Sequence, residues 1–106
     1  MEKLKGFQRK YLKGLAHGLK PVVFVGHRGM TSEVTRAADE ALSKHELIKV
    51  KFIDFKEKSQ KEEIAAAIEK ETAAEQAGMI GHMAVFYCQQ KDPEKRKITL
   101  TKRGPS

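Results

Sequence analysis

The chain has 106 residues, with 21 Lys and Arg against 14 Asp and Glu, which gives a net charge of +7 at neutral pH. This length fits one domain, and the lack of an apolar run of about 18 residues argues against a membrane-spanning helix. A strongly basic chain favours a polyanionic partner such as a nucleic acid.

We expect a cytoplasmic protein. The first five residues lack the apolar core and the cleavage site of a signal peptide. Cys88 has no second cysteine with which to form a disulfide. It stands in an apolar run with no cationic neighbour, so we expect a small buried hydrophobic residue rather than a reactive thiol.

The segment from Leu4 to Leu19 has the periodicity of an amphipathic helix that ends near Gly18 and Pro21. The apolar positions that predict its core-facing side are Leu4, Phe7, Tyr11, Leu15 and Leu19. The basic positions predicted on its outer side are Arg9, Lys13 and His17, with Lys10 beside them. We expect this outer side to contact nucleic acid, although a run of charges can also form a merely solvated surface.

A short apolar run from Pro21 to Val25 predicts a strand that is buried on both faces. It stops at Gly26-His27-Arg28-Gly29, after which Thr31 or Ser32 can cap a second helix. The predicted inner face of this helix consists of Val34, Ala37, Ala38, Ala41 and Leu42. Glu33 suits its positive end, and Lys44 and His45 suit its negative end.

The segment from Leu47 to Ile53 alternates, which predicts a second strand. Ile48, Val50 and Phe52 share one face, and Lys49 and Lys51 share the other with Leu47 and Ile53. Ser59-Gln60-Lys61-Glu62 matches a capping box and predicts the start of a third helix, whose inner face is Ile64, Ala67 and Ile68. The charge is uneven, because the stretch from Asp54 to Glu75 is acidic.

Two further strands are expected near the C-terminus. Residues Met79 to Cys88 are apolar and β-prone, interrupted by Gly81-His82, and Lys97 to Leu100 predicts a final strand. The order α-β-α-β-α-β-β predicts an α/β fold with a parallel or mixed sheet covered by helices. We expect one domain over residues 1–100 and a flexible tail over residues 101–106.

The Gly26–Gly29 segment is the main candidate for a binding site. Glycines allow the main chain to approach a ligand closely, and a helix that follows them offers free N–H groups to a phosphate. His27 and Arg28 add side-chain donors. Two glycines three residues apart can also be a simple connection between a strand and a helix.

Several blocks of this sequence resemble the CRM domain family in its stand-alone bacterial, YhbY-type form. They are spread over most of the chain in the family's order: residues 8–17, 19–23, 26–29 and 45–51, Ile80-Gly81-His82, and residues 85–87. The resemblance implies a four-stranded mixed sheet with helices, similar to the C-terminal domain of translation initiation factor three. It also implies a loop like that of KH domains and association with precursors of the large ribosomal subunit.

In KH domains the Gly-x-x-Gly loop clamps the nucleic-acid backbone, so the resemblance implies the same role for Gly26, His27, Arg28 and Gly29. The charge pattern adds further predicted RNA-binding residues: Arg9, Lys10, Lys13, His17, Lys20, Lys49 and Lys51. The chain departs from the family at His27, where Lys is frequent, and at Cys88, where Arg is frequent. The first departure replaces a permanent charge with a side chain that is mostly neutral at pH 7.

We therefore expect a non-catalytic protein that binds ribosomal RNA as a monomer, without cofactor, metal, membrane or small-molecule substrate. The loop lacks the Gly-Lys-Ser/Thr ending of a P-loop and the third glycine of a dinucleotide site. The four histidines show no metal-binding spacing. A protein-binding module acting on a ribosomal protein or assembly factor is the alternative. DNA binding is less favoured, because no predicted helix has base-reading residues clustered in its first turns.

Overall fold

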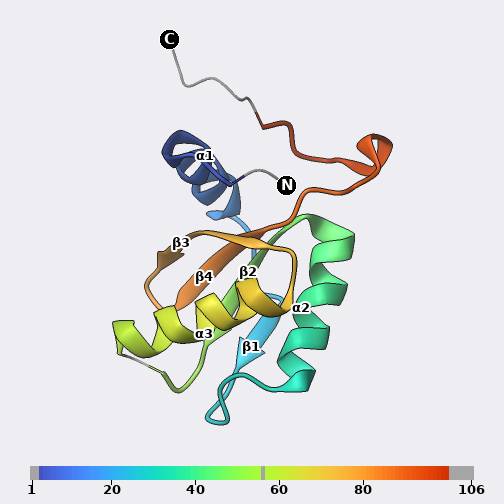
Figure 1. Ribbon diagram of the computed structural model, residues 1–106. Helices are drawn as coiled ribbons and strands as arrows, with labels where there is room; N and C mark the ends of the chain where they lie inside the picture. Colours follow the sequence, from blue (N-terminus) through green and yellow to red (C-terminus); the bar gives the residue numbers. More distant parts are fainter. Residues whose placement is uncertain (1–2, 56, 101–106) are drawn as a thin grey trace.

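The computed structural model describes residues 3–55 and 57–100. Its elements, in chain order, are α1 (Gly6–Ala16), β1 (Val23–Val25), α2 (Ser32–His45), β2 (Leu47–Phe52), α3 (Lys58–Glu71), β3 (Glu75–Ile80), β4 (Met83–Tyr87) and the short 3-10 helix η1 (Pro93–Lys95) (Figure 1). The predicted α/β class and the order of helices and strands are confirmed. The predicted tail at residues 101–106 lies outside the described residues.

The four strands form one mixed sheet in the order β1-β2-β4-β3. β1 is parallel to β2, and the other two pairings are antiparallel. Side chains alternate between the two faces of a strand, so the sheet carries two cores. One lies under α2 and α3 and contains Val25, Leu42, Phe52 and Ile68 among others. The second lies under α1.

α2 forms as its sequence predicts. The Thr31 hydroxyl accepts a hydrogen bond from the Val34 N–H (3.2 Å), which satisfies a free donor of the first turn. Glu33 lies in the first turn, and Lys44 and His45 lie in the last. Val34 is buried against the sheet together with the residues one and two turns further along, Ala38 and Leu42.

The predicted capping box of α3 is wrong. The helix begins at Lys58, and its N-cap Glu57 makes no side-chain cap bond, so Ser59 lies inside the first turn. The buried face includes Lys61, whose ammonium donates to the carbonyl oxygen of Gly81 (3.0 Å). A charged residue is tolerated there because its hydrogen bond replaces lost hydration.

The predicted core side of the first helix is wrong in part. Leu4 is buried, as predicted, and Phe7 is half-buried, but Tyr11, Leu15 and Leu19 are exposed. The buried row is Leu4, just before α1, and then Gln8, Leu12 and Ala16. This row also has a spacing of four residues. Burial of the polar Gln8 side chain is tolerated because its oxygen accepts a hydrogen bond from the Lys5 N–H (2.8 Å).

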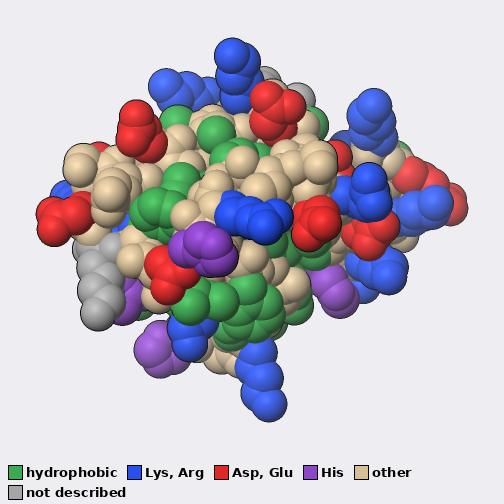
Figure 2. Space-filling view, turned by 90° about the horizontal axis from the view of Figure 1, so that it is seen from below, with side chains coloured by type: hydrophobic (Ala, Val, Ile, Leu, Met, Phe, Trp, Pro, Cys, Tyr) green, Lys and Arg blue, Asp and Glu red, His purple; other side chains and the backbone are tan. Residues whose placement is uncertain are grey.

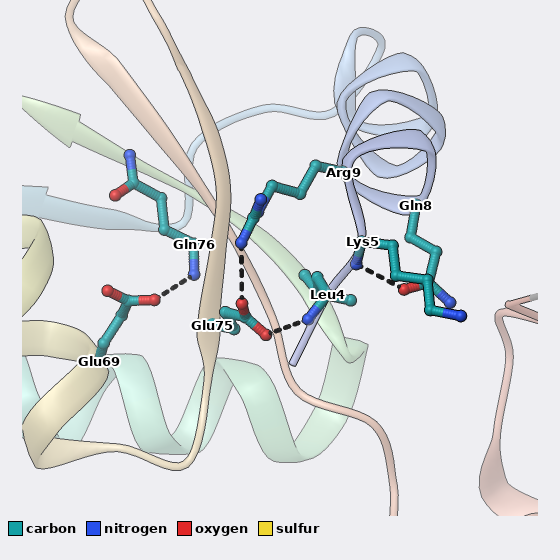
Figure 3. A network of polar contacts seen from close by, with 7 residues as sticks. All are labelled: Leu4, Lys5, Gln8, Arg9, Glu69, Glu75 and Gln76. Atoms are coloured by element: carbon teal, nitrogen blue, oxygen red, sulfur yellow. Dashed lines mark hydrogen bonds and ion pairs between the residues drawn. The ribbon is translucent and has the colours of Figure 1, made fainter. Parts of the chain in front are cut away.

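Glu75 joins α1 to the edge strand β3. Its carboxylate accepts hydrogen bonds from the Leu4 N–H (2.7 Å) and from the Arg9 guanidinium (3.2 Å) (Figure 3). On the other side of β3, the Glu69 carboxylate of α3 accepts from the Gln76 N–H (2.8 Å). The Glu75 contacts hold α1 over the β3 side of the sheet, and the Glu69 contact ties α3 to the same strand.

The last two strands are a hairpin rather than the predicted pair. β3 and β4 are connected by a two-residue turn in which Gly81 takes φ 58°, a conformation that favours glycine at this turn position. Residues 97–100 form no strand. The reason is that the N–H groups of Lys97 (2.6 Å) and Ile98 (3.1 Å) donate to the buried Glu46 carboxylate instead of to a neighbouring strand.

Candidate nucleic-acid interface

The Gly26–Gly29 loop is a tight turn at the end of β1. The Gly29 N–H donates to the Gly26 carbonyl oxygen (2.9 Å), which closes the turn. Gly29 is buried with φ 68°, and a Cβ at this position would lie 3.4 Å from the Phe55 ring. The backbone conformation and the close Phe55 ring therefore favour glycine at this position for the sake of the fold itself.

Gly26 has a different role. Its φ is not in the left-handed region, and a Cβ built on it would meet no described atom within 4 Å. The fold alone does not require glycine here. The missing side chain instead leaves open space in front of the backbone, where a ligand can approach.

The tip of the loop presents two exposed side chains, His27 and Arg28. The His27 Nδ1 lies 3.9 Å from a carboxylate oxygen of Asp54, and both side chains are largely open to solvent. This contact is an ion pair only when His27 is protonated. Arg28 makes no ion pair within the described chain, so its guanidinium is available to a ligand.

A cavity of about 420 Å³ opens beside the loop. It is lined by the loop, by Phe24 of β1 and by the first turns of α2. Glu33 also lines it, so a carboxylate already lies near the positive end of α2. An anion bound here is thus recognised mainly by the loop.

Three cations predicted to point outward are used within the fold instead. Arg9 is ion-paired with Glu75 (3.2 Å). The stem of Lys13 lies over Gly78 of β3, so close that a Cβ built on Gly78 would be 2.5 Å from the Lys13 Cδ. Lys49 is buried and donates to the His17 carbonyl oxygen (3.2 Å). The predicted outward placement is wrong for Lys49, which is buried on β2, and only partly right for Arg9 and Lys13, which are half-buried because α1 packs on the sheet with a different side from the predicted one.

The remaining predicted cations do not form one cluster. Lys10, His17, Lys20 and Lys51 are exposed. Lys10 belongs to α1, which packs mainly against β3, whereas the loop follows β1 at the opposite edge of the sheet. Figure 1 shows α1 and the loop at opposite ends of the molecule. Only Lys51 is brought near the loop, since it pairs in register with Phe24 of β1.

A family model described as the CRS1/YhbY (CRM) domain matches residues 4–87. The chain belongs to the CRM domain family. This confirms the resemblance seen in the sequence. The CRM domain is a non-catalytic family, so the prediction that the chain is not an enzyme is confirmed as well.

Relatives cover most of this CRM protein. A Haemophilus influenzae protein named "RNA-binding protein" is 42% identical over 103 residues, which are 97% of this chain and 100% of the relative. A Bacillus subtilis protein named "Probable RNA-binding protein YqeI" is 33% identical over 92% of this chain and 98% of its own length. A solution structure of a Staphylococcus aureus protein is similar with a TM-score of 0.78 and 30% identity, over 92% of this chain and all of that one.

The sequence of this CRM protein did not point to Phe24 or Asp54 as parts of the site. The sequence predicts that Phe24 lies in a strand buried on both faces, whereas Phe24 is 52% exposed. An apolar run of five residues cannot show which face of an edge strand lacks a covering helix. The only signal for Asp54 was its position directly after the second predicted strand.

No helix in residues 3–55 and 57–100 is long and apolar enough to cross a membrane. Among the same residues, no three His, Cys, Asp or Glu side chains gather into a possible metal site. Burial raises the pKa of the Cys88 thiol, which disfavours the reactive thiolate. This agrees with the predicted structural role of Cys88, which packs partly buried against the core.

Proposed function

We propose that this CRM protein binds RNA without catalysing a reaction, and that the Gly26–Gly29 loop grips the RNA backbone. The observation that carries the proposal is the loop itself. Its turn is fixed by Gly29, its tip exposes His27 and Arg28, and Gly26 leaves open space beside the backbone. The names of the Haemophilus influenzae and Bacillus subtilis relatives support RNA as the ligand.

The finer parts of the proposal go beyond RNA binding. The RNA is ribosomal and belongs to precursors of the large subunit, as the family resemblance implies, and the protein acts as a cytoplasmic monomer. We also propose that the loop resembles that of KH domains. The fold, in the same proposal, resembles the C-terminal domain of translation initiation factor three. Finally, we propose that residues 1–100 form a single domain.

The test is a double substitution at the tip of the loop. His27→Asp with Arg28→Asp removes the Arg donor and places negative charge where a phosphate would bind. A hydrogen bond to a charged group is worth about 1.5 to 3 kcal/mol. RNA affinity, measured by fluorescence anisotropy on a ribosomal RNA fragment at fixed salt, should therefore fall by about tenfold or more. In cell extracts, the same variant should be lost from the sedimentation fractions that hold large-subunit precursors.

A matched control keeps the charge change and moves it away from the loop. Ala66→Glu with Lys70→Glu alters two exposed residues of α3 by the same total charge. This control should retain most of the affinity, and both variants should melt close to the parent. If the loop variant loses less than about threefold, or no more than the α3 control does, the loop is not the binding site.

A further inference from the structure

Residues 3–55 and 57–100 leave part of the sheet open on the face that carries α1. α1 covers this face over Leu47, Ala77, Val85 and Tyr87, which lie toward one end of the strands. Beyond them, one residue from each strand lies in register in a row across the whole sheet. The row consists of Phe24, Lys51, Met83 and Ile80.

This open sheet face is unusually apolar for a surface. Phe24 is 52% exposed and Ile80 is 40% exposed. Two more exposed residues lie on this face, Val22 just before β1 and Ile53 just after β2. Contiguous exposed apolar residues on a small domain mark a binding surface more often than scattered single ones do. Figure 2 views the molecule from the loop end and shows hydrophobic side chains gathered beside Lys, Arg and His side chains.

The open sheet face is continuous with the loop. Phe24 lines the same cavity as Gly26, His27, Arg28 and Gly29, and the loop begins two residues after Phe24. A ligand whose charged part rests on the loop therefore has an aromatic ring and an apolar strip directly beside it. This combination of charged grip and aromatic surface suits single-stranded nucleic acid, whose bases stack on aromatic side chains.

Lys51 distinguishes an RNA ligand from an apolar protein segment. It lies inside the row, between Phe24 and Met83, and forms no ion pair with any described residue. An apolar partner covering this face would remove water from that ammonium without replacing it, which is costly. A nucleotide offers both a base for the ring and a phosphate for the ammonium.

We propose that the open sheet face is a platform on which bases of single-stranded RNA stack, with Phe24 as the stacking ring beside the backbone grip of the loop. This inference rests on the proposed RNA-binding function. It makes Phe24 a residue that selects unpaired over paired RNA, because the bases of a duplex already stack on one another.

The test compares Phe24→Leu, which removes the ring and keeps an apolar side chain, with Phe24→Tyr, which keeps the ring. The probe is a short unstructured RNA carrying an adenine analogue whose fluorescence is quenched by stacking, with a duplex of the same sequence beside it. Loss of one aromatic stacking partner weakens binding about five- to a hundredfold. Phe24→Leu should bind the single strand more weakly by this factor and quench the adenine analogue less. Its affinity for the duplex, and the fluorescence of the duplex, should match those of the parent. Phe24→Tyr should stay within about twofold of the parent.

Tyr11→Leu is the matched control, since Tyr11 is 49% exposed on α1, away from the loop, and it should leave affinity unchanged. Phe24 is half exposed, so thermal unfolding should confirm that each variant folds. The platform is overturned if Phe24→Leu binds the single strand as the parent does, or if it weakens single strand and duplex equally. Failure of the parent to bind any RNA would refute the proposed function itself. If only the His27→Asp, Arg28→Asp variant loses RNA affinity, the proposed function stands and the stacking platform is contradicted.

Discussion

Glu46 shows how much one buried residue can organise. It is fully buried and takes φ 59°, a conformation that side chains rarely adopt. Its carboxylate accepts hydrogen bonds from the N–H groups of Gln90 (2.9 Å), Lys97 and Ile98. These bonds replace the hydration that burial removes. One acidic side chain thus fixes the path of the chain after β4.

Tyr87 gives a prediction about pH. Its side chain is fully buried, and its hydroxyl has no hydrogen-bond partner in the described part of the chain. Burial raises the pKa of Tyr87 to about 12 from 10.0, and the Glu46 carboxylate acts in the same direction. Below pH 10 the Tyr87 phenol is neutral in both the folded and the unfolded state, so its full contribution to the free energy of unfolding is present. Between pH 10 and 12 the unfolded chain loses this proton first, and stability falls as pH rises.

Tyr87→Phe should remove this part of the alkaline loss, which amounts to about 3 kcal/mol at most. At neutral pH the variant should lie within about 1 kcal/mol of the parent, since an unpartnered hydroxyl contributes little. Urea unfolding at a series of pH values measures both. Equal losses of stability in parent and variant above pH 10 would contradict the assignment.

At the scale of elements, the docking of α1 depends on Glu75. We predict that Glu75→Gln lowers the free energy of unfolding by about 1 kcal/mol, because it removes the charge that pairs with the partly exposed Arg9. The difference from the parent should shrink in high salt, which screens the pair. Thermal unfolding at two salt concentrations measures this.

Glu62→Gln is the comparison, since Glu62 pairs with Lys58 at 3.9 Å and both side chains are well exposed. It should change stability by no more than about 0.5 kcal/mol. A Glu75 variant as stable as the Glu62 variant would show that α1 is held by its buried row of residues alone.

Elements were predicted best where the local pattern had one interpretation. The Thr31 cap and the Val34, Ala38 and Leu42 spacing define α2 without reference to the rest of the chain. α1 offered two rows at helical spacing, and packing on the sheet selected the row with Gln8 and Ala16. β3 begins at Glu75, with too few apolar residues to be recognised as a strand. The two glycines indicate the loop, but the open sheet face depends on which part of the sheet α1 covers, and no local pattern encodes that.

For the whole molecule, the charge of +7 gives a prediction about salt. Each phosphate contact releases counterions, so about five contacts should give a slope near −3.5 for the logarithm of RNA affinity against the logarithm of salt concentration, on single strands. Anisotropy titrations over a range of salt measure it. Arg9, Lys13 and Lys49 are engaged within the fold, so replacing Lys51 should reduce the slope more than replacing Lys13. An affinity independent of salt would rule out electrostatic binding.

The two outer strands are both poor templates for a further strand. β1 has only three residues and ends at the Gly26–Gly29 loop, and β3 has an irregular register between Gln76 and Gly78. Short or bulged edges hinder the edge-to-edge pairing that leads to aggregation. The apolar strip on one face of the sheet is therefore not joined to a strand edge that readily pairs with other chains, and association by strand addition is disfavoured.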